Sequence, residues 1–406
     1  MKIFDEYNSS EQIYEKALQV KSKFEEAFGD FSNSNIAITP ASMILLGDHT
    51  HYNDGILLSA SLDTYNVVVL RKRKDNIVNI INVNNDRKIE FSLSDIRDEQ
   101  SIDFKYHVGL VKTFKKNNLI HNGFDCVYSS DVPECLGIGK YASIQTAFAS
   151  AIKKSFRLNL NIDELVNLIY QNDLNIIGKI SNKTHYYTTL LSKKNKFFFY
   201  DLRSKEYKTI PVKNNFEVVI IDTSERINNS LKICNERIEE CEVGVKGLRL
   251  YIWGIKNLRD VGFDFLIKHY HMLPKKIFNR VLYNVKERER VEKAIESLKQ
   301  NSFDEFGKYL SESHWSMSKD YELSCEECDF IVSKAMENEC VVGSKMISCS
   351  PLRSTYHIVK KDCSESFINF IKYLFKEKFN QELVAYKFNF AEGIKEFSSK
   401  KFEKVI

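Results

Sequence analysis

The densest group of polar side chains in the sequence follows an apolar run and has the composition of a polyol-binding turn. Residues 47–55 read Gly-Asp-His-Thr-His-Tyr-Asn-Asp-Gly, directly after the apolar residues 43–46. Carboxylate, imidazole, phenol and amide groups in one turn can donate and accept the several hydrogen bonds that a polyol requires. The candidate ligands are Asp48, His49, His51, Tyr52 and Asn53. Two alternatives stay open, a metal site built on Asp48 with His49 and His51, and a buried hydrogen-bonded turn without a ligand.

A second candidate site is a glycine-containing loop that leads into a helix. Gly137 and Gly139 precede a helical pattern that starts at Lys140, and Ser143 lies in its first turn. Backbone N–H groups and the helix dipole favour a phosphate group at such a start. Structural glycines at an ordinary helix start would give the same pattern, so the loop alone does not decide between the two.

The elements that must position these loops alternate between strand and helix periodicity. A capping-box pattern at Ser9 and apolar residues spaced three and four apart predict an amphipathic helix that ends before Gly29. Short apolar runs predict strands over 66–70 and 77–81, paired across a charged, solvated turn at 71–75. Further helices are predicted over 140–156, 163–171 and 304–315, and further strands over 197–200, 218–221 and 386–390. The first half is therefore expected to be mixed α/β and the second half mainly helical.

Composition and charge narrow the class of protein. A chain of 406 residues with a hydrophobic fraction of 43% can bury the cores of two or three domains. Subtracting 55 Asp and Glu from 59 Lys and Arg leaves a net charge of +4, too weak a field to recruit nucleic acid. No apolar run approaches about 18 residues, and the first residues do not form a secretory leader. We therefore expect a cytoplasmic protein that binds neither nucleic acid nor membrane.

The cysteines do not form a recognisable framework. The sequence contains 9 of them, an odd number that favours reduced thiols over disulfides. Cys325 and Cys328 form the only CxxC pair, and a zinc site there would need two further ligands at a recognisable spacing. The sequence therefore does not favour zinc.

The two candidate loops, taken together, resemble motifs of the galactokinase family of the GHMP kinase superfamily. Residues 40–55 follow the family's first signature, P-G-R-V-N-L-I-G-E-H-T-D-Y-N-x-G. Residues 234–241 are similar to its Y-N-x-R-R-x-E-C segment. Residues 306–314 and 321–325 are similar to its F-G-x-L-M-x-x-S-H and Y-E-V-S-C segments. The resemblance runs nearly from end to end.

This resemblance implies an α/β (α+β), two-domain GHMP kinase fold. A ribosomal-protein-S5-like domain is expected over residues 1–222 and a ferredoxin-like domain over 223–406, with the last strand free to return to the first domain. Family members use Mg-ATP to phosphorylate galactose at the anomeric hydroxyl, which implies ATP, magnesium and a galactose-like sugar or cyclitol as ligands. Carried over residue by residue, the family's motifs assign nucleotide binding to Gly137, Gly139 and Ser143, the metal to Ser143, and sugar binding to Asp48, His49, His51, Tyr52, Asn53 and Cys234.

Several positions depart from the family's motifs and suggest a divergent member with degenerate catalytic motifs. Ser42 replaces an arginine, His185 replaces the catalytic aspartate, and Gln171 replaces a glutamate that supports magnesium. The glycine run of the third signature is absent from residues 347–352, and Tyr141 replaces a small residue of the phosphate loop. Loss of one preorganised electrostatic group commonly lowers a rate by about a hundredfold.

Two hypotheses follow from these departures. The first is a pseudokinase with impaired phosphoryl transfer, which binds a sugar, a nucleotide or a protein partner and acts in regulation or as a scaffold. The second is an active ATP-dependent sugar kinase in which His185 is the general base and Asp48 positions the hydroxyl. A third class, a reactive-thiol enzyme built on Cys234 or Cys349, lacks a base at a suitable spacing. The structural alternative for His185 is a position in a surface turn that begins at Asn182.

Overall fold

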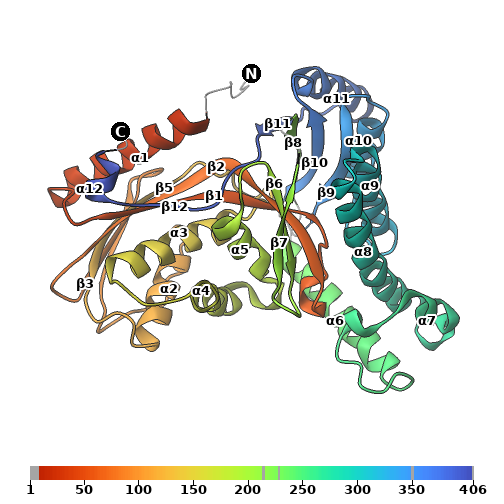
Figure 1. Cartoon of the computed structure of the whole chain (residues 1–406), viewed down its shortest axis with the longest axis horizontal. Helices are drawn as coiled ribbons and strands as arrows, with labels where there is room; N and C mark the ends of the chain where they lie inside the picture. Colours follow the sequence, from red (N-terminus) through yellow and green to blue (C-terminus); the bar gives the residue numbers. More distant parts are fainter. Residues whose placement is uncertain (1–8, 213–214, 227–228, 349–351, 405–406) are drawn as a thin grey trace.

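The computed structural model describes residues 9–212, 215–226, 229–348 and 352–404, which form two β-sheets with helices packed on their faces (Figure 1). The first sheet has the strand order β12-β1-β2-β5-β3-β4, and the β6–β7 hairpin pairs with β2. Its strands are β1 (Asn35–Leu46), β2 (Ile56–Lys72), β3 (Ile77–Asn82), β4 (Arg87–Ser92), β5 (Phe124–Ser130), β6 (Lys196–Asp201), β7 (Tyr207–Pro211) and β12 (Lys395–Ser398).

Helices cover both faces of this first sheet. One face carries α2 (Lys105–Lys116), α3 (Lys140–Ser155), α4 (Ile162–Ile177) and α5 (Lys183–Leu191), as Figure 1 shows. The other face carries α1 (Ser9–Phe28) and α12 (Ser399–Phe402). The amphipathic helix expected after Ser9 is confirmed, because Ala17, Val20 and Phe24 are fully buried against the strands.

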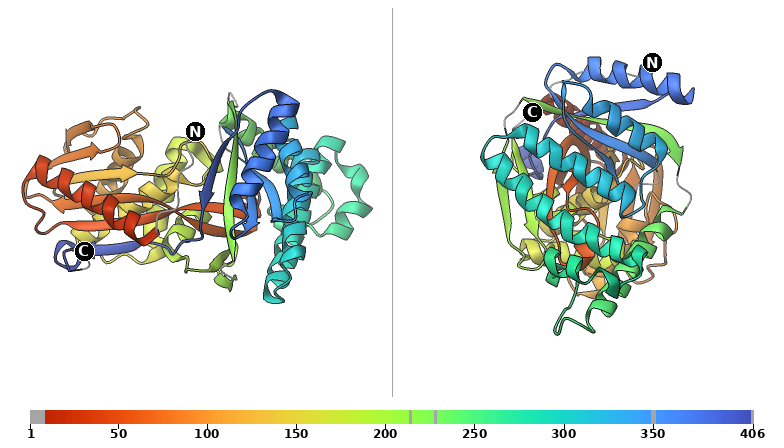
Figure 2. Two further views of the ribbon diagram at one scale, coloured as in Figure 1. Left: turned by 90° about the horizontal axis from the view of Figure 1, so that it is seen from above. Right: turned by 90° about the vertical axis from the view of Figure 1, so that its right-hand side faces the viewer.

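The second sheet is antiparallel and has the strand order β11-β8-β10-β9. Its strands are β8 (Phe216–Arg226), β9 (Val341–Ile347), β10 (Leu352–Lys360) and β11 (Val384–Phe388). The helices of this half are α6 (Ser230–Leu248), α7 (Phe263–Lys268), α8 (Lys275–Lys299), α9 (Phe303–Lys319), α10 (Glu326–Met336) and α11 (Ser364–Phe379). Figure 2 shows α8 and α9 side by side on the outer side of this sheet. Among the described residues, no helix is long and apolar enough to cross a membrane.

A shared apolar core joins the two halves. It contains Leu45 and Leu58 from the first sheet together with Ile220 and Tyr356 from the second, and Tyr356 donates a hydrogen bond of 2.6 Å to the carbonyl of Leu45. The division of the chain at residue 222 stays a prediction; β8 spans this position within the second sheet, and β12 pairs with β1 in the first.

One predicted strand pairing is wrong. Both predicted strands around the charged turn 71–75 form, as β2 and β3, but β5 lies between them and pairs with each. The turn is also less solvated than expected, since Arg71 and Arg73 form ion pairs of 3.2 and 2.9 Å with Asp125 of β5, whose side chain is only 3% exposed. These ion pairs hold the connection between β2 and β3 against β5.

Candidate functional site

The centre of the candidate site is a meeting of three segments that are far apart in the sequence. Ser42 lies on β1, Gly139 is the N-cap residue of α3, and His185 lies in the first turn of α5. Ser42 Oγ and His185 Nδ1 are 2.9 Å apart, and a Cβ added to Gly139 would lie 2.5 Å from Ser42 Oγ and 2.9 Å from His185 Nδ1. Glycine is therefore required at position 139 for the start of α3 to reach the Ser42–His185 pair.

His185 lies in a helix and not in the surface turn that was one expectation for it. Asn182 caps α5 by accepting a hydrogen bond from the backbone N–H of Thr184, so the turn-like residues before His185 begin a helix. His185 is partly exposed. Burial lowers the pKa of His185 to about 4, while the negative charge of Asp48 opposes this shift. The imidazole is therefore neutral at neutral pH, and its pKa is close to that of an ordinary carboxylic acid.

Asp48 and His51 are the sugar-site candidates that interact electrostatically with His185 and with each other. His51 Nε2 lies 3.1 Å from the carbonyl of Ile180, so this nitrogen carries the proton and donates. His51 Nδ1 is then a hydrogen-bond acceptor, and among the described residues it has no partner. A hydroxyl-bearing ligand would satisfy this buried acceptor.

The Asp48 carboxylate is held by a buried lysine from the other half of the chain. Lys345 on β9 is fully buried, and its Nζ lies 2.5 Å from Asp48 Oδ2 and 3.8 Å from Oε1 of the buried Glu287 on α8. Glu287 in turn accepts from the backbone N–H of Gly47 at 3.0 Å and pairs with Arg290 at 2.9 Å. This network fixes the turn after β1 against the second half of the protein.

Tyr52 and Asn53 form hydrogen bonds with side chains of the second half, and His49 lies within hydrogen-bond distance of Tyr52. The Tyr52 hydroxyl lies 3.0 Å from His49 Nδ1 and 2.7 Å from the hydroxyl of Tyr321, and Asn53 donates to Asn284 Oδ1 at 3.1 Å. His49 and Asn53 are 2% and 5% exposed, so these contacts position the turn within the interior. The structure thus separates the predicted sugar-binding set into a group near His185 and a group that packs between the halves.

Cys234, the remaining sugar-site candidate, lies on α6 in a small apolar cluster with Ile180 and Ile238, against which Tyr52 packs. Its side chain is 3% exposed. Cys234 therefore adjoins the turn through apolar packing. Cys349, the other cysteine considered as a nucleophile, lies outside the described residues, as do the two residues that follow it.

The loop before α3 has the backbone form of an anion site. Cys135, Gly137 and Gly139 have φ angles of +63°, +74° and +66°, so alternate residues take the left-handed conformation. Such alternation turns successive N–H groups to one side, and no side chain caps the start of α3. The bulky Tyr141 stacks on Tyr106 of α2, with ring centroids 4.7 Å apart. Positive φ angles beside an uncapped helix start are an arrangement that favours an anion.

Neither Ser143, which was assigned to magnesium, nor Gln171, which replaces the family's supporting glutamate, offers a charged ligand. Ser143 is fully buried, and its Oγ donates to the carbonyl of Pro40 at 2.6 Å and accepts from Asn66 Nδ2 at 2.7 Å. The first and second strands of the sheet thus already use the hydroxyl of Ser143, and its assignment to nucleotide and metal binding stays a prediction. Gln171 is an exposed neutral amide, a poor ligand for a hard dication. The described residues contain no cluster of three or more His, Cys, Asp or Glu side chains that could hold a metal.

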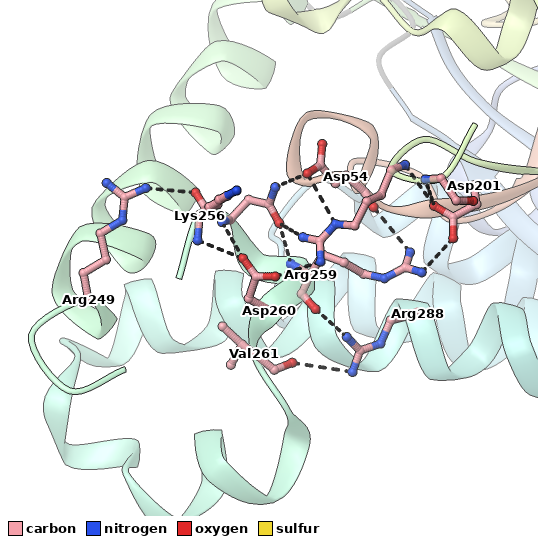
Figure 3. Close-up of polar contacts among 11 residues, drawn as sticks. Asp54, Asp201, Arg249, Lys256, Arg259, Asp260, Val261 and Arg288 are labelled. Atoms are coloured by element: carbon pink, nitrogen blue, oxygen red, sulfur yellow. Dashed lines mark hydrogen bonds and ion pairs between the residues drawn. The ribbon is translucent and has the colours of Figure 1, made fainter. Parts of the chain in front are cut away.

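A group of polar contacts, called here the latch, holds the far end of the turn at residues 47–55 (Figure 3). Arg259, from the segment between α6 and α7, pairs with Asp201 Oδ2 at 2.8 Å and donates to the carbonyl of Asp54 at 3.3 Å. Arg288 of α8 donates to the carbonyl of Arg259 at 2.8 Å. This latch, Arg259 with Asp54, Asp201 and Arg288, joins the turn, the β6–β7 hairpin and the helical layer.

Lys345 and Glu287 were not among the site residues expected from the sequence. A signal for each exists, since Lys345 interrupts the apolar strand 341–347 and Glu287 lies on the helix face that buries Val281, Asn284 and Val291. A charge on a buried stripe requires a partner of opposite sign. The identity of that partner depends on the tertiary fold.

Comparisons with known proteins find relatives along nearly the whole chain. The family model described as the galactokinase galactose-binding signature matches residues 22–72. The galactokinase of Fusobacterium nucleatum is 30% identical over 377 residues, which cover 91% of this chain and 97% of that protein. The galactokinase of Clostridium acetobutylicum is 31% identical over 375 residues, which cover 90% of this chain and 95% of that protein.

Solved structures share the fold. A structure of Lactococcus lactis galactokinase complexed with galactose has a TM-score of 0.87 at 22% identity, covering 93% of this chain and 99% of that one. Mevalonate kinase from Methanococcus jannaschii has a TM-score of 0.61 at 17% identity, covering 88% and 98%. The two-domain α/β GHMP kinase fold expected from the sequence is confirmed. With relatives at 30% and 31% identity over nine-tenths of its length, the chain belongs to the galactokinase family of the GHMP kinase superfamily.

Proposed function

We propose that this protein is an ATP-dependent kinase that phosphorylates a galactose-like sugar or cyclitol, with His185 as the general base. The observation that carries this proposal is the contact of Gly139 with the Ser42–His185 pair, which brings the phosphate loop beside a neutral imidazole. The overall similarity to proteins named galactokinase also supports an active kinase more than a pseudokinase.

The hydrogen bond between Ser42 and His185 bears on which ring nitrogen of His185 can accept a proton. In the tautomer in which Nδ1–H donates to Ser42 Oγ, Nε2 has a free lone pair and can accept the proton of a sugar hydroxyl. The negative charge of Asp48 then stabilises the imidazolium that forms. Because its imidazole is neutral at neutral pH, His185 can accept a proton in place of the family's carboxylate.

The remaining residues bind and orient the reactants. ATP supplies the phosphoryl group when it is bound, and the N–H groups of residues 137–142 can hold its phosphates. His51 Nδ1 accepts a hydrogen bond from a hydroxyl of the sugar, and Asp48 orients the hydroxyl that reacts. Magnesium would be bound together with the phosphates of ATP, whose oxygens are ligands that this ion prefers.

The test is ADP release from Mg-ATP at high protein concentration across a panel of free sugars and cyclitols. Removal of a general base commonly lowers a rate by about 10²–10⁴-fold, so His185→Ala should lose turnover by that factor. His121→Ala is the matched control, since His121 is exposed. Equal turnover in His185→Ala and the wild type would refute the role of His185. A folded wild-type protein that is inactive with every sugar would instead support the pseudokinase hypothesis.

A further inference from the structure

The CxxC pair in the second half of the protein places two thiols at the start of a helix. Cys325 is the N-cap residue of α10, and the backbone N–H of Cys328 donates to Cys325 Sγ at 3.4 Å. The two thiols also hydrogen-bond to one another. Cys325 is partly exposed, whereas Cys328 is fully buried. The pair thus combines one partly exposed cysteine, Cys325, with one fully buried cysteine, Cys328.

The charged groups around Cys325 have opposite effects on the pKa of its thiol. The side chain of Arg353, at the start of β10, hydrogen-bonds to Cys325 and favours the thiolate, whereas Glu327 disfavours it and itself lies 3.8 Å from Arg353. The hydrogen bonds from Cys328 lower the pKa of the Cys325 thiol, and the neighbouring Cys325 and burial raise that of Cys328.

A second nearby acid, Asp329, already forms several hydrogen bonds. Asp329 accepts hydrogen bonds from Ser318 and Ser324 at 2.7 and 2.5 Å, and lies 3.2 Å from His314 Nε2. A zinc ion would need two further ligands beside the thiols, and no such group occurs among the described residues. The surroundings of the pair therefore do not favour a zinc site.

We propose that Cys325 and Cys328 form a reversible disulfide by exchange with a low-molecular-weight disulfide. The Cys325 thiolate attacks one sulfur of that disulfide, forms a mixed disulfide and releases one thiolate. Cys328 then loses its proton to solvent and attacks Cys325 Sγ, which forms the intramolecular bond and releases the second thiolate. The protein loses two electrons and the small disulfide gains them, so its two halves leave as thiols.

The test uses oxidised and reduced glutathione in defined ratios with the full chain. After an acid quench and alkylation of the free thiols, intact mass and peptide mapping identify which cysteines have reacted. The wild type should lose two alkylation sites and yield a peptide linked through Cys325 and Cys328. Cys328→Ser should instead keep one stable glutathione on Cys325, because the resolving thiol is absent.

A second thiol pair in the same half provides the matched control. Cys340 and Cys363 also hydrogen-bond to each other, but this contact raises the pKa of Cys363. We therefore expect exchange at Cys325 to be on the order of tenfold faster than at either of these residues. Cys340→Ser should oxidise like the wild type. The proposal is overturned if wild-type Cys325 does not react, if its glutathione adduct persists, or if the Cys340–Cys363 pair oxidises first.

Discussion

Replacing Lys345 with methionine tests whether its ion pairs with Asp48 and Glu287 hold the turn at residues 47–55 in place. Lys345 Nζ lies 3.8 Å from Oε1 of Glu287, and both side chains are fully buried. At an effective dielectric constant of about 20, this single attraction is worth about 4 kcal/mol before desolvation is counted. Removing one partner of a buried ion pair commonly costs about 3–5 kcal/mol. Because Arg290 continues to pair with Glu287, we expect Lys345→Met to lose about 3 kcal/mol of unfolding free energy.

The assay is urea unfolding of Lys345→Met, Asp48→Asn and the double variant. If Asp48 and Lys345 interact directly, the double variant should lose about 1–3 kcal/mol less than the sum of the single losses. Lys308→Met is the control, since Lys308 is 70% exposed and pairs with Glu312 at 3.9 Å. That change should stay within about 0.5 kcal/mol. Single losses that add to within about 0.5 kcal/mol would refute the coupling between the turn and β9.

Three further predictions concern the titration of buried histidines, the loop at Gly139 and the latch at Arg259. Burial lowers the pKa values of several histidines to about 3 or 4, namely His49, His51, His107, His185 and His357. The unfolded chain therefore binds more protons than the folded chain below about pH 6.5. The free energy of unfolding should fall by about 1.4 kcal/mol per pH unit for each histidine as the pH drops towards 4. A urea midpoint that is unchanged between pH 7 and pH 5 would contradict this. Gly139→Ala should lower kcat/KM at least about tenfold by displacing Ser42 or His185, whereas Gly178→Ala, which is also at positive φ but has no atom within 4 Å of the added Cβ, should not. Arg259→Met should cost about 1–3 kcal/mol and speed proteolytic cleavage between residues 249 and 262, and an unchanged digestion pattern would show that the latch is not needed there.

The helices and strands with strong periodicity could be predicted from the sequence. The pattern of Ala17, Val20 and Phe24 predicts α1 because one face of a helix must be apolar to pack on a sheet. The order of strands could not be predicted in this way. The insertion of β5 between β2 and β3 depends on pairing between residues about fifty positions apart, and local periodicity carries no information about that distance.

The candidate site could be predicted in part. The turn at 47–55 and the loop at Gly139 are recognisable because their residue types are unusual in combination. The orientation of Ser143 could not be predicted, because a hydroxyl in a first helical turn can face either the loop or the sheet. Its hydrogen bonds with Pro40 and Asn66 turn it towards the sheet. The contact of Ser42 with His185 joins residues 143 positions apart, so it becomes visible only in the folded chain.

The pairing of β12 with β1 has a consequence for the order in which the protein matures on the ribosome. Asn35 to Ile38 pair with Ser398 to Lys395, so this stretch of β1 receives its second neighbour only after nearly all of the chain has been translated. An open strand edge readily recruits strands from other chains. During synthesis the nascent protein must therefore keep this edge uncovered while the whole second half emerges and folds. Polypeptides that stop before Lys395 retain the open edge and should depend on chaperones or aggregate.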